Sequence, residues 1–176
     1  MTNKRTVTVD KYARNAEAWK QSAAIAYTAS SLLFESHNLL LIFPAATLGH
    51  HSLEMYLKAA LISEGCTVFD PKKIKHLDSS VALQTGDCAW GHDLVALARQ
   101  LAARRPDFDL AEPMTFLLPL HSGVPTLERG FEVFNPFFSE LRYPQGLKEL
   151  GGVGEDDKLT LDELVASLQP FLEKIK

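Results

Sequence analysis

Four polar side chains lie close together in an otherwise apolar segment of the chain. His50, Glu54 and Lys58 recur every four residues, and His51 follows the first of them. In an α-helix this spacing stacks the side chains along one side, and a glutamate one turn before a lysine is the favourable order for an ion pair. His50 can add a second partner to Glu54. The functional interpretation is a polar pocket that holds a phosphate or a base, and the alternative is a partly buried ion pair without a ligand.

Two other pairs of residues could bind an anion or a nucleobase. His92 and Asp93 stand where a helix is expected to begin, so backbone amides could hold an anion beside the imidazole. The alternative is that Asp93 only caps the helix. Arg142 and Tyr143 could clamp a phosphate and stack on a base, and the alternative is that Tyr143 anchors the end of its helix.

Cys66, His76, Cys88 and His92 are all residue types that bind zinc. Their separations are irregular and include no close pair of cysteines, which does not favour a structural zinc site. The sequence also lacks a glycine-rich phosphate loop followed by lysine, and it lacks a nucleophile-elbow motif around a serine. We therefore expect neither a bound metal nor a cofactor.

The composition is that of one globular domain of 176 residues, with 46% hydrophobic and 23% charged residues. A net charge of -4 provides no global basic field for nucleic acid, so any such contact must depend on a local patch. The two cysteines form no dense disulfide framework, no secretory signal opens the chain, and the apolar run over residues 39–46 is too short to span a bilayer. We expect a cytoplasmic protein without membrane contact.

Hydrophobic periodicity predicts an all-α protein, an up-and-down bundle of about five helices within a single domain. The expected helices span residues 14–36, 43–65 and 92–104, then two shorter pieces over 113–121 and 126–141 with a break at Pro136, and a last helix that opens with Thr160 and Glu163 as a capping box. Residues 1–12 are expected to form a loose arm, 66–91 a long loop and 151–157 an exposed connector.

The helix expected over residues 43–65 carries the polar line and must position it. The short link before this helix predicts that it lies antiparallel to its predecessor, and Gly65 suits the left-handed conformation that ends a helix. Its predicted packing face consists of Ala45, Leu48, Ser52, Met55, Ala59 and Ile62.

Three segments of the chain occur in an order typical of a known family. They contain Glu54, Leu57 and Lys58 in HHSLEMYLKAALISEG, His92, Asp93 and Leu94 in GHDLVALARQL, and Arg142, Tyr143 and Pro144 in FFSELRYPQ. Together they resemble the HEPN family, the higher eukaryote and prokaryote nucleotide-binding domains, in which a Glu-x-x-Leu-Lys-like helix precedes a His-Asp-Leu helix start and a later Arg-Tyr-Pro. The resemblance covers most of residues 14–175 and implies a dimeric bundle of four or five helices.

Family members with RNase activity carry an arginine followed, after four to six residues, by a histidine. No arginine of this chain has a histidine at that spacing. The resemblance therefore implies a homodimeric, noncatalytic module that binds a nucleotide or RNA, or that accompanies a nucleotidyltransferase or a toxin–antitoxin or defence partner. Its expected ligand-binding residues are His50, Glu54, Lys58, His92, Asp93, Arg142 and Tyr143.

Two alternatives stay open at the level of the sequence. One is a metal-independent RNase toxin with a displaced catalytic histidine, such as His50, His51 or His92. Such cleavage needs one group to take the 2′-hydroxyl proton and another to protonate the leaving oxygen, and histidine suits both tasks. The other alternative is a dimerisation scaffold in which the polar line is only structural.

Overall fold

The structure is a computed structural model that describes residues 16–66, 91–116, 125–138 and 155–175. Within these ranges it contains five α-helices and two short 3-10 helices, which confirms the all-α bundle predicted from periodicity. None of these helices combines the length and the apolar composition needed to cross a bilayer. The predicted arm and nearly all of the predicted loop over residues 66–91 fall outside the described ranges. In chain order the elements are α2 (Ala16–Glu35), η1 (Leu39–Leu41), α3 (Ile42–Ser63), α5 (Leu94–Arg104), α6 (Leu127–Phe134), η2 (Asn135–Phe138) and α7 (Glu155–Leu172).

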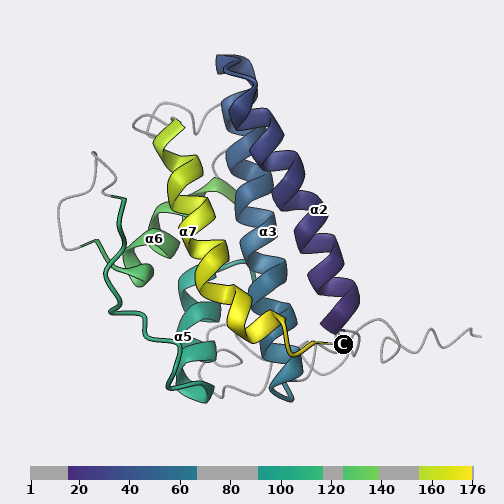
Figure 1. Ribbon diagram of the computed structural model, residues 1–176, viewed down its shortest axis with the longest axis vertical. Helices are drawn as coiled ribbons and strands as arrows, with labels where there is room; N and C mark the ends of the chain where they lie inside the picture. The colour runs from purple at the N-terminus through teal and green to yellow at the C-terminus, as the bar shows by residue number, and fades with distance from the viewer. Residues whose placement is uncertain (1–15, 67–90, 117–124, 139–154, 176) are drawn as a thin grey trace, which may run out of the picture.

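Helix α3 lies at the centre of the bundle, between α2 and α7 (Figure 1). Helix α2 runs beside α3 in the opposite direction, because only a short turn and η1 separate the two helices. Helix α7 runs in the same direction as α3, and α5 and α6 complete the bundle on the remaining side. The antiparallel pairing predicted for the first two helices is therefore confirmed.

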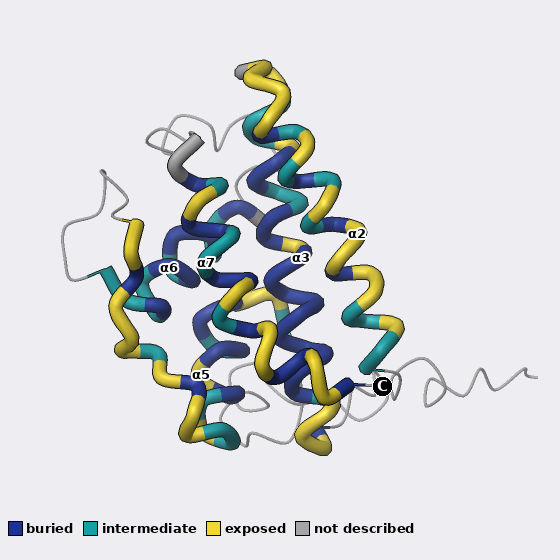
Figure 2. The backbone as a smooth tube through the Cα atoms, in the orientation of Figure 1, coloured by how far each residue is buried: buried dark blue, intermediate teal, exposed yellow. Residues whose placement is uncertain are grey.

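The sequence of α3 explains its central position. Its apolar residues are not confined to the predicted packing face, since Leu53, Leu57 and Leu61 are also fully buried. Within the predicted face, Leu48 and Ile62 are only partly buried. Figure 2 accordingly shows α3 as buried over much of its length. Neighbouring elements therefore enclose α3 on several sides, and His50, Glu54 and Lys58 are enclosed with it.

The packing around α3 is close at Gly49. A Cβ atom at this position would lie 3.0 Å from Leu161, 3.1 Å from Phe134 and 3.3 Å from the Ser30 hydroxyl. These three side chains belong to α7, α6 and α2. Because glycine has no side chain, all three helices can approach the backbone of α3 immediately before His50.

The segment after α5 differs from the prediction of a helix over residues 113–121. Pro113 takes part in an isolated antiparallel bridge instead of starting a helix. The amides of Thr115 and Phe116 donate hydrogen bonds to the Glu163 carboxylate of α7, at 2.6 and 3.3 Å. These long-range interactions hold the backbone in a non-helical form, so the prediction is wrong up to Phe116. The rest of the expected helix falls outside the described residues.

The start of α7 also differs from the prediction. The helix begins at Glu155, before the expected N-cap, and Thr160 is fully buried inside it. Acidic residues are favourable in a first helical turn, and this helix opens with three of them. Glu163 binds the amides of another segment rather than the N-cap amide. The predicted capping box of Thr160 and Glu163 is therefore wrong.

Other predicted boundaries are confirmed. The Thr126 hydroxyl accepts a hydrogen bond from the Arg129 amide and caps the N-terminus of α6. Helix α6 ends before Pro136, where the missing proline amide does not support a continued α-helix, and η2 follows. Gly65 follows α3 with a φ of 85°, in the left-handed region that glycine adopts easily.

The Gly49→Ala substitution should destabilise the protein by up to about 2 kcal/mol net, because an added methyl group overpacks the contact with three helices at a cost of about 1–3 kcal/mol. This loss should outweigh the gain of about 1 kcal/mol that alanine brings to a helix interior. Urea denaturation measures the difference. Thr28→Ala on the exposed side of α2 is the control, since it raises helix propensity without filling a contact. A Gly49→Ala protein as stable as the wild type would contradict the close packing.

Candidate functional site

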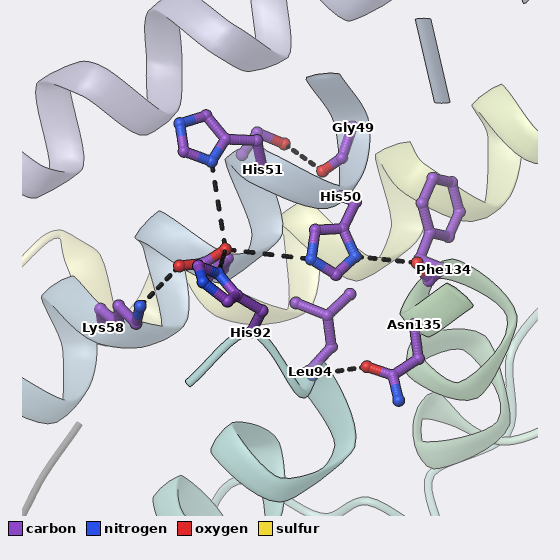
Figure 3. A network of polar contacts seen from close by, with 10 residues as sticks. Gly49, His50, His51, Lys58, His92, Leu94, Phe134 and Asn135 are labelled. Carbon is purple, nitrogen blue, oxygen red and sulfur yellow. Dashed lines mark hydrogen bonds and ion pairs between the residues drawn. The ribbon is translucent and has the colours of Figure 1, made fainter. Parts of the chain in front are cut away.

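The Glu54 carboxylate is the centre of a polar cluster, and its partners His50, His51, Lys58 and His92 are labelled in Figure 3. Only 4% of its side chain is exposed, and Oε1 accepts a hydrogen bond from Lys58 Nζ at 2.5 Å. Oε2 accepts a hydrogen bond from His92 Nδ1 at 2.9 Å. The structure thus brings together Glu54 and His92, two residues that the sequence placed in separate segments. The predicted ion pair between Glu54 and Lys58 is present.

Three imidazoles approach the same carboxylate oxygen. Apart from the His92 contact, His50 Nε2 lies 3.9 Å and His51 Nδ1 lies 4.0 Å from Glu54 Oε2. His50 is fully buried, whereas about half of the His51 and His92 side chains is exposed, 51% and 53%. We call the residues His50, His51, Glu54, Lys58 and His92 the Glu54 cluster. It therefore has a buried part and a surface formed by two histidines.

The environment of the cluster shifts the pKa values of its buried members. Burial alone would raise the pKa of Glu54, but the Lys58 charge and the hydrogen bonds from His92 and Lys58 outweigh it, and the pKa is lowered. Burial lowers the pKa of His50, against the raising effects of the Phe134 carbonyl and the Glu54 charge. Glu54 is therefore ionised and His50 neutral at physiological pH.

Lys58 is directed into the protein, where it contacts Glu54 and Trp19. Only 9% of its side chain is exposed, and its ammonium lies 5.6 Å from the centre of the Trp19 ring of α2. A cation over the face of an indole is attracted by the ring. Three of the residues predicted to bind a ligand, Lys58, Glu54 and His50, are thus buried. Glu54 contacts both of the others.

Asp93 lies at the N-terminus of α5, as predicted. Its carboxylate accepts a hydrogen bond from the Ala96 amide at 3.0 Å and caps the helix. The Leu94 amide is also used, since it donates to Asn135 Oδ1 at 2.7 Å. The interpretation of Asp93 as a cap therefore has direct structural support, and two amides of this helix end already bind protein oxygens.

A second set of contacts, which sequence analysis missed, connects the cluster to α6. His50 Nδ1 lies 2.9 Å from the Phe134 carbonyl oxygen, and Asn135 follows directly and binds Leu94. A backbone carbonyl carries no signal in the sequence. Asn135 had one possible signal, because asparagine before a proline is typical of a chain turn or helix boundary.

Most of the other residues considered as ligands in the sequence lie outside the described part of the chain. Arg142 and Tyr143 lie outside the described residues, as do His76 and Cys88 of the possible zinc ligands. Cys66 is buried at the end of α3. Within the ranges that the structure describes, no group of three or more histidine, cysteine, aspartate or glutamate side chains has an arrangement that could hold a metal ion.

No protein-family model, curated protein or solved structure matches the chain significantly. The function is therefore inferred from the geometry of the Glu54 cluster and from the resemblance of the three sequence segments.

Removing one charge from the buried pair should destabilise the protein more than removing both. Glu54→Leu and Lys58→Met should each cost about 3–5 kcal/mol, because each leaves an uncompensated buried charge. The double variant should recover much of this loss, since hydrophobic side chains of similar volume can replace a buried ion pair. Denaturant unfolding of the four proteins forms a double-mutant cycle. Additive losses would show that the pair is not coupled.

Acidification should destabilise the protein in two steps. The pKa of His50 is lower in the fold than its ordinary value of 6.5, so the unfolded chain binds more protons as the pH falls through this value. Glu54, also lowered, adds a second loss below its ordinary value of 4.5. The free energy of unfolding should therefore fall between about pH 7 and pH 5, and fall less in His50→Asn, which keeps a donor but does not titrate.

Comparison at pH 8 separates this proton effect from packing. Any difference between wild type and His50→Asn at that pH measures the cost of the substitution itself. The change in this difference in unfolding free energy between pH 8 and pH 5 measures the effect of protonating His50. Parallel curves for the two proteins from pH 8 to pH 5 would show that His50 does not contribute.

Proposed function

We propose that the protein is a noncatalytic module that binds a nucleotide or RNA, with a phosphate group of the ligand held by His51 and His92. One observation carries the proposal: two half-exposed imidazoles from different elements face the same buried carboxylate oxygen. Each ring directs Nδ1 toward Glu54, so Nε2 points elsewhere. A protonated imidazole carries a hydrogen on both ring nitrogens, so in that form each ring can keep Nδ1 toward Glu54 and donate from Nε2 to an oxygen of one phosphate.

The charges of the cluster favour an anionic ligand when His51 or His92 is protonated. Lys58 balances the charge of Glu54 inside the protein. Protonation of His51 or His92 therefore adds net positive charge at the surface where the ligand would bind. The sequence as a whole has a net charge of -4, so binding must depend on this local charge.

The resemblance to the HEPN family supports the rest of the proposal. It supports a homodimer in the cytoplasm, and a nucleotidyltransferase or an antitoxin-like partner. Arg142 and Tyr143 lie outside the described residues, and their expected roles, to bind a phosphate and to stack on a base, rest on the sequence alone. Glu54, Lys58 and His50 act indirectly, because their side chains are buried.

A second candidate function is metal-independent RNA cleavage. It is favoured by the same two imidazoles, because cleavage requires two proton-transferring groups at one phosphodiester. One neutral histidine would take the 2′-hydroxyl proton, and one protonated histidine would give a proton to the departing 5′ oxygen. A carboxylate that binds Nδ1 orients the ring for such a role.

Binding should be lost in steps when the surface histidines are removed. A fluorescein-labelled single-stranded RNA of mixed sequence is titrated with protein, and fluorescence anisotropy gives Kd. His51→Ala and His92→Ala should each raise Kd roughly tenfold, because a hydrogen bond to a charged group contributes about 1.5 kcal/mol or more. His37→Ala, an exposed histidine beyond the end of α2, is the matched control and should bind like the wild type.

A denaturing gel of the recovered RNA separates the two functions. Intact RNA supports the binding module. Cleaved RNA, with cleavage lost in His51→Ala and His92→Ala but kept in His37→Ala, supports the RNase. If the wild type neither binds nor cleaves RNA and no free nucleotide raises its melting temperature, both functions are rejected and the polar cluster is structural.

A further inference from the structure

Where His92 lies depends on where the backbone of α5 begins. His92 stands two residues before Leu94, the first residue of this helix. The Leu94 side chain is fully buried, and its amide donates to Asn135 Oδ1 at 2.7 Å. The backbone next to His92 is thus fixed by a side chain from η2. Asn135 itself does not belong to the Glu54 cluster.

Asn135 is in turn fixed by α3. Its own amide donates to the Phe131 carbonyl, and the preceding carbonyl, that of Phe134, lies 2.9 Å from His50 Nδ1. The Phe134 side chain is fully buried against Gly49. A buried histidine of α3 therefore sets the position of the residue that anchors α5.

The contacts form a closed ring. It runs from Glu54 to His92, along the backbone to Leu94, through Asn135 and Phe134 to His50, and back to Glu54 across 3.9 Å. His50 and Glu54, between which the ring closes, both lie on α3, one turn apart. His92 is consequently held relative to Glu54 by two routes, one direct and one through Asn135. Figure 3 shows the Leu94–Asn135 and His50–Phe134 contacts of the second route.

We infer that Asn135 is a positioning residue for the phosphate site, one that sets the affinity for the ligand by fixing His92 without touching the ligand. The consequence for affinity rests on the proposed function, whereas the placement of His92 does not. Without the Asn135 oxygen, the start of α5 is free to move and the His92 imidazole samples more orientations. A preorganised imidazole loses less conformational entropy when it binds a phosphate.

The test separates positioning from simple helix capping. Asn135→Ala removes the acceptor oxygen, and Asn135→Asp restores one at the same place. Thr126→Ala is the matched control, because it removes the N-cap of α6 without touching the route to His92. The imidazole signals of His92, assigned from a His92→Gln sample, are followed by NMR through a pH titration. Kd for the labelled RNA is measured on the same samples.

Asn135→Ala and Thr126→Ala should lower the melting temperature to a similar extent. Only Asn135→Ala should shift and broaden the His92 signals, and only it should raise Kd, by roughly three- to tenfold. Asn135→Asp should return the His92 signals toward those of the wild type. If Asn135→Ala does not fold, Asn135→Ser, with a shorter acceptor, is compared in its place.

The outcomes distinguish this inference from the proposed function. His92 signals that are the same in Asn135→Ala and Thr126→Ala would overturn the positioning role, whatever the RNA result. If Asn135→Ala alters the His92 signals but the wild-type protein binds no RNA, the proposed function is rejected and the positioning of His92 by Asn135 stands. Altered signals with an unchanged Kd would reject the effect on affinity.

Discussion

The ionised Glu54 carboxylate inside a helical bundle is the constraint on which the site depends. Removing a charge from water costs several kcal/mol, so a buried carboxylate must receive compensating donors. Lys58 supplies one from the next turn of the same helix, and His92 supplies the other from the start of α5. The first donor is local, but the second requires that two elements keep a fixed distance. The charge thus determines where α5 must begin, and Trp19 of α2 lies over the lysine that balances it.

Stability alone does not require such a cluster. A well-packed apolar pair of the same volume is often as stable as a buried ion pair, because the desolvation cost disappears with the charges. An apolar residue at position 54 would, however, leave His92 without its acceptor and His51 without a nearby carboxylate. The charged arrangement therefore contributes orientation: the Glu54 carboxylate accepts a hydrogen bond from the half-exposed His92 and lies 4.0 Å from the half-exposed His51. The proposed function would use this orientation, because a binding site needs side chains that are held in place before the ligand arrives.

The sequence predicted what depends on neighbouring residues along the chain. The four-residue spacing of Glu54 and Lys58 was sufficient to predict their ion pair, and periodicity was sufficient for α2, α3 and α5. Contacts between distant segments were not predictable in this way. The partner of His50 is a backbone carbonyl on α6, and Glu163, expected in a capping box, instead binds amides from the segment after α5. In both cases tertiary hydrogen bonds determine the local structure, and residue type and spacing carry no record of them.

The packing of α3 explains why the ring of contacts can be rigid. Gly49 allows α2, α6 and α7 to approach the backbone at the turn that carries His50, so the Phe134 carbonyl comes within reach of the imidazole. A larger residue at position 49 would move Phe134 away, and with it Asn135 and the start of α5. The exposed imidazole of His92 is thus placed by a glycine that it does not contact. If the proposed function holds, a site built in this way has little freedom to lose on binding, so more of its interaction energy with a phosphate appears as affinity.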